Sequence, residues 1–244
     1  MSDFRIYGES APDLVPDSEG SPKLLREPRR LAASAGAAWI GQAWGLFTRR
    51  WGLWVGMSFV MLLITTVVSM LPLVGFLSNF LTLFFAGGMM LAAAALAEND
   101  DLEFVYLFGG FQHKFKELLI LTLLYFLVLL LVVFVFVVVM YLTGTNISDW
   151  DSEQPSVAAM AMYGWIILAG FAALVPVSMM MWFATVLTVL DDVAPWQAMK
   201  MSFQGCVRNI LPFIVYGLVW LGLSLVIGLL AMGLVMLFDW VWLP

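Results

Sequence analysis

The chain has 244 residues, of which 63% are apolar and 11% are charged, and its net charge is −6. A soluble globule of this length needs far more polar surface, so the composition excludes a soluble fold and predicts an integral membrane protein. The sequence contains no basic stripe of the kind that binds nucleic acid, and its single cysteine, Cys206, excludes an intramolecular disulfide.

The first part of the chain differs from the rest. Residues 1–28 are rich in Ser, Pro, Gly and acidic residues, and such a segment has too few apolar groups to pack. It is predicted to be a disordered acidic tail in the cytoplasm, and residues 29–244 are predicted to form a single helical membrane domain. The first apolar segment begins near Trp51, so it is expected to act as an uncleaved anchor.

Five segments are apolar over the roughly 20 residues that a helix needs to cross a bilayer. None of them contains a charged residue or a histidine, and they cover residues 51–71, 76–97, 118–142, 157–190 and 210–237. The fourth segment is too long for a straight crossing and contains Pro176. Proline removes a backbone hydrogen bond and clashes with the preceding helical turn, so a kink is predicted at this residue.

The basic residues lie on one side of these five segments. All eleven Lys and Arg residues precede the first segment, or lie between the second and third or between the fourth and fifth. The cytoplasmic loops of membrane proteins carry an excess of Lys and Arg. The distribution therefore predicts a cytoplasmic N-terminus, cytoplasmic loops at 98–117 and 191–209, and an external C-terminus.

Three short stretches precede the first, third and fifth segments, at residues 30–50, 102–117 and 195–208. Aromatic and aliphatic residues recur in them at roughly helical spacing among small and polar ones, which predicts amphipathic helices in the cytoplasmic headgroup layer. The candidate lipid-interface residues are the bases and tryptophans of these stretches: Arg49, Arg50, Lys114, Lys116, Lys200, Arg208, Trp39, Trp44 and Trp196.

Two parts of the chain resemble each other. Phe111-Gln112 recurs as Phe203-Gln204, and the acidic pair Asp100-Asp101 recurs as Asp191-Asp192 at nearly the same offset. The similarity predicts a parallel internal repeat, with units at 76–142 and 157–237. Parallel repeats of this kind occur in some transporters, whereas chance similarity between apolar segments is the alternative.

The acidic pairs allow two interpretations. Asp100, Asp191 and Asp192 stand just before predicted short helices, where carboxylates act as helix caps. Duplicated carboxylates at one membrane face also suit a divalent cation or a lipid headgroup, but capping is the simpler explanation. His113 is the only histidine, and no hydrolase or nucleotide-binding motif is present. The sequence thus predicts no catalytic residue, no cofactor and no metal site.

Four stretches carry a family resemblance: 38–51, Gly87-Gly88-Met89, Phe108-Gly109-Gly110-Phe111, and 182–209. In them the chain resembles a family of uncharacterised multi-pass bacterial inner-membrane proteins, similar in layout to the membrane domain of glycerophosphodiester phosphodiesterases. The resemblance implies a helical bundle in the inner membrane and no established activity. Members of that family usually continue into a further span, whereas this sequence ends soon after the fifth.

The preferred hypothesis is a non-enzymatic inner-membrane protein that organises lipid or partner proteins at the cytoplasmic leaflet, where anionic lipids attract bases. An alternative is a permease-like protein for neutral or lipid-like cargo, suggested by the predicted repeat and by Pro176. A third is a membrane enzyme acting on a lipid. Membrane lipids are the expected partners, with a second copy of the chain or another membrane protein as further candidates, because small residues such as Ser224 and Gly228 allow close helix contact.

Overall fold

The computed structural model describes residues 28–72, 75, 77–98, 101–142 and 157–242, and these ranges contain helices and no strand. Residues 1–27 of the predicted tail, and Asp100, lie outside these ranges. The elements are α1 (Ala35–Arg49), α2 (Trp51–Ser69), α3 (Leu77–Ala97), the 3-10 helix η1 (Phe104–Phe108), α4 (Gly109–His113), α5 (Phe115–Leu142), α6 (Val157–Trp182), α7 (Ala184–Leu190), α8 (Pro195–Arg208) and α9 (Ile210–Trp242).

The structure confirms the all-α class and the five predicted spans. Five stretches are long and apolar enough to cross a membrane: Trp51–Ser69, Leu77–Ala97, Phe115–Leu142, Met160–Leu190 and Ile210–Phe238. Their bounds lie within a few residues of the predicted ones. The third span begins at Phe115 rather than at residue 118, because the preceding short helix ends earlier than its sequence pattern suggested.

The fourth span consists of two helices, α6 and α7, which are separated at Phe183. Pro176 lies inside α6. The helix is interrupted at Phe183 because the hydroxyl of Ser202 inserts between two backbone groups that would otherwise form a helical hydrogen bond. It accepts the N–H of Phe183 at 2.9 Å and donates to the carbonyl of Met179 at 2.6 Å. A side chain inserted into the backbone ladder in this way breaks a helix.

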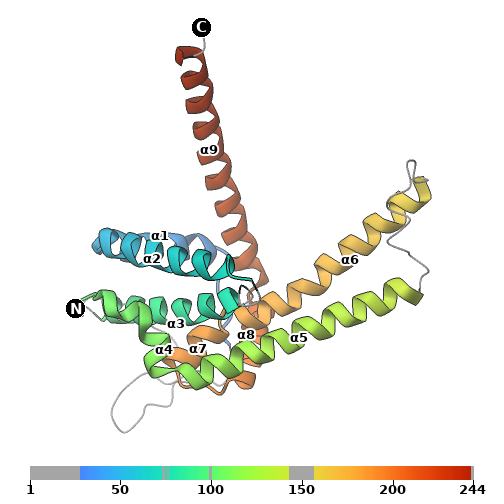
Figure 1. The fold of residues 1–244 in the computed structure, drawn as a ribbon, viewed down its shortest axis with the longest axis horizontal. Helices are drawn as coiled ribbons and strands as arrows, with labels where there is room; N and C mark the ends of the chain where they lie inside the picture. Colours follow the sequence, from blue (N-terminus) through green and yellow to red (C-terminus); the bar gives the residue numbers. More distant parts are fainter. Residues whose placement is uncertain (1–27, 73–74, 76, 99–100, 143–156, 243–244) are drawn as a thin grey trace.

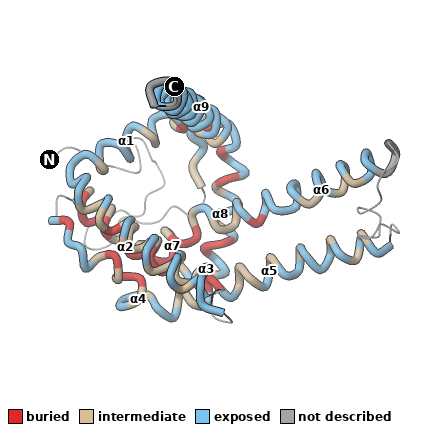
Figure 2. Tube along the Cα trace, turned by 45° about the horizontal axis from the view of Figure 1, so that its top comes forward, coloured by how far each residue is buried: buried red, intermediate tan, exposed pale blue. Residues whose placement is uncertain are grey.

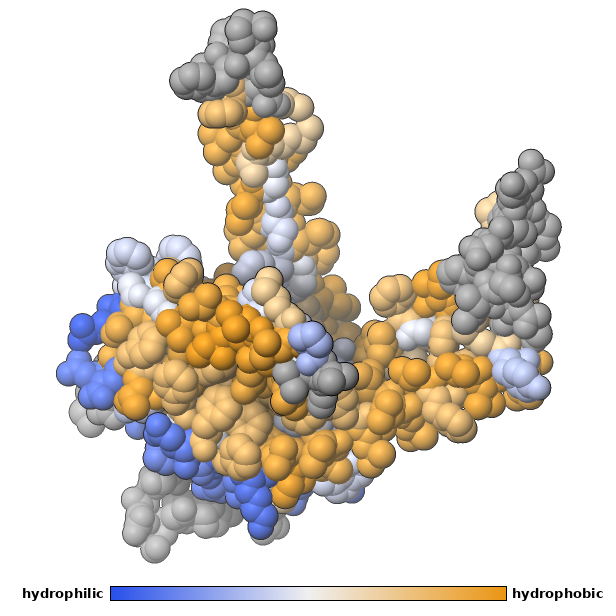
Figure 3. Space-filling view, in the orientation of Figure 1, coloured by the Kyte–Doolittle hydropathy of each residue, from blue (hydrophilic) through white to orange (hydrophobic). Residues whose placement is uncertain are grey.

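The long helices leave a common centre in different directions (Figure 1). α2 and α3 form one antiparallel pair, α5 and α6 run together as a second pair, and α9 stands apart from both (Figure 1). Buried residues concentrate near the centre, in α3, α7 and α8, whereas the outer parts of α5, α6 and α9 are exposed (Figure 2). The exposed surfaces of these outer parts are hydrophobic (Figure 3), as expected for helices that face lipid.

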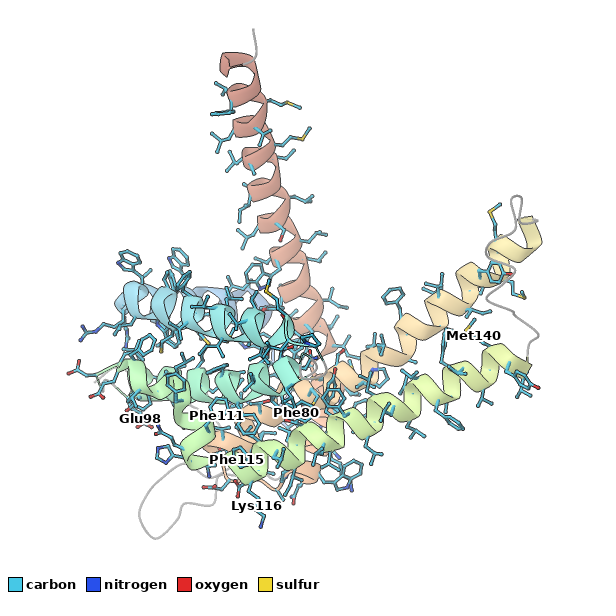
Figure 4. The ribbon with its side chains drawn as sticks, viewed as in Figure 1. Phe80, Glu98, Phe111, Phe115, Lys116 and Met140 are labelled. Carbon is cyan, nitrogen blue, oxygen red and sulfur yellow. The ribbon has the colours of Figure 1, made fainter. Side chains whose placement is uncertain are left out.

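α3 is the central helix of the core. One face of it packs with α5, α7 and α8 around Phe84, Leu118 and Met199, and another packs with α2 and η1 around Phe85, Met57 and Leu107. Aromatic rings extend the first contact, because Phe84 stacks on Phe111 at 4.8 Å and Phe80 on Phe126 at 4.9 Å between ring centroids. Figure 4 shows Phe80, Phe111 and Phe115 along this seam.

Candidate functional site

Three spans begin directly after a short helix, with a single non-helical residue between the two. Arg50 separates α1 from α2, Lys114 separates α4 from α5, and Asn209 separates α8 from α9. Their backbone angles are similar, with φ and ψ of −143° and 47° at Arg50, −131° and 29° at Lys114, and −122° and 34° at Asn209. We call these three residues the elbows, because each redirects the chain from a short helix into a span.

Two elbows form ion pairs with the segment that precedes a different short helix. Nη2 of Arg50 lies 2.7 Å from Oδ1 of Asp101, which precedes η1 and α4. Nζ of Lys114 pairs with Oδ1 of Asp192, which precedes α8. Both carboxylates are largely exposed, so each pair contributes about 0–1 kcal/mol. The two ion pairs show that each of these elbows lies against the segment that precedes another short helix.

The third elbow binds the segment that precedes α1. The side-chain oxygen of Asn209 accepts the N–H of Leu31 at 2.8 Å, and its amide nitrogen donates to the carbonyl of Arg29 at 2.9 Å. Arg208 donates to the carbonyl of Pro28 at 3.0 Å. Since Asn209 is buried at 8% exposure, losing these bonds would leave polar groups unsatisfied, which costs about 1–3 kcal/mol for each group.

Together these contacts connect the short helices in a closed cycle, which we call the elbow ring. The elbow after α1 meets the start of η1 and α4, the elbow after α4 meets the start of α8, and the elbow after α8 meets the start of α1. The last contact joins residues that are 178 positions apart in the chain. The ring is therefore completed by segments near opposite ends of the described chain.

Each short helix also packs closely on the backbone of a long helix. An added Cβ at Gly36 of α1 would lie 2.0 Å from the carbonyl oxygen of Pro212 in α9, and one at Gly110 of α4 would lie 2.2 Å from that of Phe84 in α3. In α8 the residue facing the backbone is Ser202, which bonds to Met179 of α6 as described above. Small residues at these three contacts let the helices approach to backbone distance.

Most of the predicted lipid-interface residues lie at the elbows or in the short helices, on exposed surface. Trp44 is 65% exposed and Trp196 48%. Lys200 lies 5.1 Å above the ring of Trp196, in a cation–π arrangement. Arg49, which also donates to the carbonyl of Leu96 at 3.2 Å, is exposed, as are Arg50, Lys116 and Arg208. Figure 4 shows Lys116 at the start of α5, pointing away from the other helices.

Two of the predicted residues have inward contacts. Trp39 is half-buried and packs edge-on against Phe213, with ring centroids 5.5 Å apart, so it joins α1 to α9. Lys114 is also half-buried and forms an ion pair with Asp192.

Lys116 does not lie at the end of a short helix, where the sequence pattern predicted it. It lies in the first turn of α5. The elbow at Lys114 follows Phe111 by three residues, whereas the elbow at Asn209 follows Phe203 by six.

The cap role predicted for Asp191 and Asp192 is wrong. The N-cap position of α8 belongs to Ala194, Pro195 follows it, and no side-chain cap bond is formed. Asp191 instead ends α7, and Asp192 has a φ of 55°, which lets its carboxylate reach Lys114. Asp191 lies at an exposed position, but partial desolvation of its carboxyl, and secondarily the neighbouring Asp192 carboxylate, raise its pKa above its ordinary 3.8. Among the residues that the structure describes, no group of three His, Cys, Asp or Glu side chains could hold a metal ion.

A cavity of 370 Å³ lies between α6, α8 and α9. Its walls include Phe171, Val175, Ser178 and Trp182 of α6, Cys206 of α8 and Phe213 of α9. Burial raises the pKa of the Cys206 thiol to about 11, although the neighbouring Ser202 hydroxyl acts in the opposite direction. The thiol is therefore protonated at neutral pH and is a poor nucleophile.

Sequence reasoning missed Ser202, Gly36 and the role of Asn209. Each acts through a partner that is distant in the sequence, so no local pattern identifies it. The sequence does contain one indication of the role of Asn209. In the predicted repeat Asn209 is equivalent to Glu117, so both units have a polar residue directly before an apolar span. A polar residue directly before an apolar span is expected to have a backbone partner when it is buried.

The chain is similar to a curated protein of Burkholderia thailandensis that is named a probable inner membrane protein. The two are 31% identical over 205 residues, which cover 80% of this chain and 75% of the relative. No protein-family model matches the chain, and no solved structure matches it. The relative and the five candidate spans together confirm the predicted multi-pass location in the inner membrane.

Proposed function

The chain belongs to the family of this Burkholderia thailandensis inner membrane protein, and on that premise we propose that it is a non-enzymatic protein that organises lipid at the cytoplasmic leaflet. The observation that carries the proposal is the elbow ring. Three short helices are tied to one another at the points where spans begin, and two of them, α1 and α8, carry exposed bases and tryptophans. The ring thereby holds several headgroup contacts at fixed positions.

The proposal includes the orientation predicted from the basic residues, with the elbow ring on the cytoplasmic side. The cytoplasmic leaflet carries anionic lipid, which contributes about 1 kcal/mol for each nearby Lys or Arg. Lys116 is exposed in the first turn of α5, two residues after the elbow at Lys114, and Lys200 is exposed in α8. Trp196 is 48% exposed beside Lys200, and Trp44 is 65% exposed in α1. Both suit the headgroup layer, where tryptophan is enriched.

The predicted repeat supports the same proposal. In each unit a long helix leads into a short helix, an elbow and another long helix, as α3, α4 and α5 do in one unit and α6, α8 and α9 in the other. We propose that α1, its elbow and α2 form a third, shorter copy of this arrangement. Three copies around one ring would present similar contacts to lipid on several sides.

Preference for anionic lipid tests this function. The full chain is reconstituted in phosphatidylcholine vesicles, and the association of spin-labelled phosphatidylglycerol is compared with that of spin-labelled phosphatidylcholine by electron paramagnetic resonance. The wild type should prefer phosphatidylglycerol. The double variant Lys116→Gln, Lys200→Gln should lose up to about fivefold of that preference for each base, as expected from about 1 kcal/mol.

The double variant Arg5→Gln, Lys23→Gln is the matched control, because it removes the same two charges from the predicted tail and should leave the preference unchanged. Equal association of the two lipids with the wild type would contradict the proposal. So would a double variant that retains the full preference while keeping its elution profile and its helical content.

Transport of a neutral or lipid-like cargo is the second candidate, and the cavity between α6, α8 and α9 favours it. The cavity belongs to the second predicted repeat unit alone, because all three helices lie within residues 157–242. A cavity inside one repeat unit can bind a ligand, whereas transport is expected to need a path between the two repeat units. The cavity therefore supports ligand binding more directly than it supports transport.

A further inference from the structure

We propose that the cavity between α6, α8 and α9 binds one hydrocarbon chain of a membrane lipid. The function proposed above concerns headgroup charge, whereas this site concerns the acyl chain, so each can fail while the other holds. Two spans and one short helix form the walls, and the bilayer is thus the immediate source of a ligand.

The size of the cavity favours a flexible chain over a single side chain of a neighbouring helix. Its volume is 370 Å³, whereas a cavity of about 150 Å³ already holds benzene. One aromatic ring inserted from outside would leave more than half of the space empty, and unfilled space loses dispersion contacts. A hydrocarbon chain can bend to fill an irregular space, and pockets of about 300–1,000 Å³ are typical of small-molecule ligands.

The polarity of the lining indicates the chemical class of the ligand. The hydroxyl of Ser178 donates to the carbonyl of Leu174 at 3.0 Å, and the thiol of Cys206 donates to that of Met179 at 3.5 Å. The hydroxyl and the thiol thus both donate their hydrogen bonds to backbone carbonyls of α6. The remaining lining is aliphatic and aromatic, so it suits a hydrocarbon chain, which brings no polar group that would need a hydrogen-bond partner.

The position of the cavity relates it to the leaflet on the side of the elbow ring. Cys206 and Phe213 stand on either side of the elbow at Asn209. Trp182, at the end of α6, is 49% exposed and is suited to the zone between headgroups and acyl chains. A lipid whose headgroup lies beside the elbow ring could place one chain in the cavity without crossing the bilayer.

Photo-crosslinking tests the site directly. The full chain is reconstituted in vesicles of phosphatidylethanolamine and phosphatidylglycerol that contain a trace of phosphatidylcholine with a diazirine near the end of one acyl chain. After irradiation, labelled peptides are identified by mass spectrometry. Labelling should concentrate in the peptides of residues 171–182 and 206–213, above the level found on the outer part of α9, and unlabelled phosphatidylcholine should compete with it.

Variants that fill the cavity provide the control. Ser178→Phe and, independently, Val175→Trp place a ring in the space and should reduce cavity labelling about tenfold, the change that corresponds to about 1.4 kcal/mol. Ser224→Phe and Val235→Trp make the same replacements at exposed positions of α9 and should leave it unchanged. Each variant must elute as the wild type does.

Two outcomes would overturn the proposal. One is labelling of the cavity peptides no stronger than that of the outer surface of α9, or unaffected in both filled variants. The other is labelling of the cavity peptides that unlabelled phosphatidylcholine does not reduce, which would show that the cavity does not hold the chain as a site. A preference for phosphatidylglycerol that persists in the filled variants would leave the headgroup proposal standing alone.

Discussion

At the scale of single residues, Ser202 shows how one hydroxyl determines the course of a span. Its oxygen connects the N–H of Phe183 to the carbonyl of Met179, two groups that would bond to each other in a continuous helix. α6 therefore ends, and α7 starts with a new axis that brings Ala184 and Val189 into the core. The position of this break depends on a residue 19 positions later in the chain.

Replacing this serine should destabilise the protein. In Ser202→Ala the amide of Phe183 loses its acceptor, which costs about 1–3 kcal/mol in a buried setting. Thermal unfolding of the detergent-solubilised protein, followed by circular dichroism, measures the effect. Ser224→Ala, at an exposed position of α9, is the control and should unfold with the wild type. If the two variants unfold at the same temperature, the serine does not maintain the break.

A second prediction concerns Asp191, which lies at an exposed position but whose pKa is raised by partial desolvation of its carboxyl and further by Asp192. The fold therefore favours the protonated carboxyl, but because solvent screens an exposed group, the expected effect on stability is small. Its contribution to stability is fully present below the ordinary pKa of 3.8 and is lost as the pH rises through the raised value. Asp191→Asn keeps the group neutral, so this variant should be more stable than the wild type at neutral pH and similar to it at low pH.

Unfolding temperatures measured across this pH range check the second prediction. Asp101→Asn is a suitable control, because its carboxylate is 85% exposed in the ion pair with Arg50 and contributes little. An Asp191→Asn variant that is less stable than the wild type at neutral pH would show that the ionised carboxylate makes a favourable contact.

At the scale of elements, the close contact between α1 and α9 fixes the position of the first turns of the last span. Gly36 faces the carbonyl of Pro212 and the N–H of Tyr216, at distances of 2.0 and 2.7 Å from an added Cβ. Trp39, one turn along α1, packs against Phe213. Backbone atoms cannot move aside as a side chain can, so this contact tolerates only glycine.

Gly36→Ala should therefore separate the two helices. Overpacking of this kind costs about 1–3 kcal/mol, and the unfolding temperature in detergent should fall accordingly. Gly41→Ala is the matched control, because it lies in the same helix with nothing within 4 Å of the added Cβ. There, replacing glycine with alanine in a helix should stabilise by about 0.5–1 kcal/mol. Equal unfolding temperatures for the two variants would refute a close contact between α1 and α9.

The sequence predicted the elements better than their connections. The five spans follow from runs of apolar residues, which is a local property that length and hydropathy reveal. The sequence pattern predicts a short stretch that continues to residue 117, whereas α5 already begins at Phe115, because aromatic residues recur across the boundary between the two helices. The ion pair of Lys114 with Asp192, and the bonds of Asn209 to residues 29–31, are contacts between distant segments. No local pattern encodes such contacts.

At the scale of the whole molecule, the orientation of the elbow ring is the main prediction. Cys206 is buried at 1% exposure, so its failure to react with an impermeant maleimide would not report which side it faces. In a Cys206→Ala background, Lys116→Cys should be protected in intact cells and should react after the membrane is opened. Ser152→Cys, in the predicted external loop, should react in intact cells. Exchange of these two results would reverse the topology.

The bond between Leu31 and Asn209 also has a consequence for the order of assembly during synthesis. Its two partners are separated by 178 residues, so translation at about 5–20 residues per second delays their meeting by roughly 10–35 seconds. During that interval α2, α3, α5 and α6 can already enter the bilayer, while α1 still lacks the helix it packs against. The nascent chain must therefore keep its early segment available until the final span leaves the ribosome, and closing the ring becomes one of the last steps of folding.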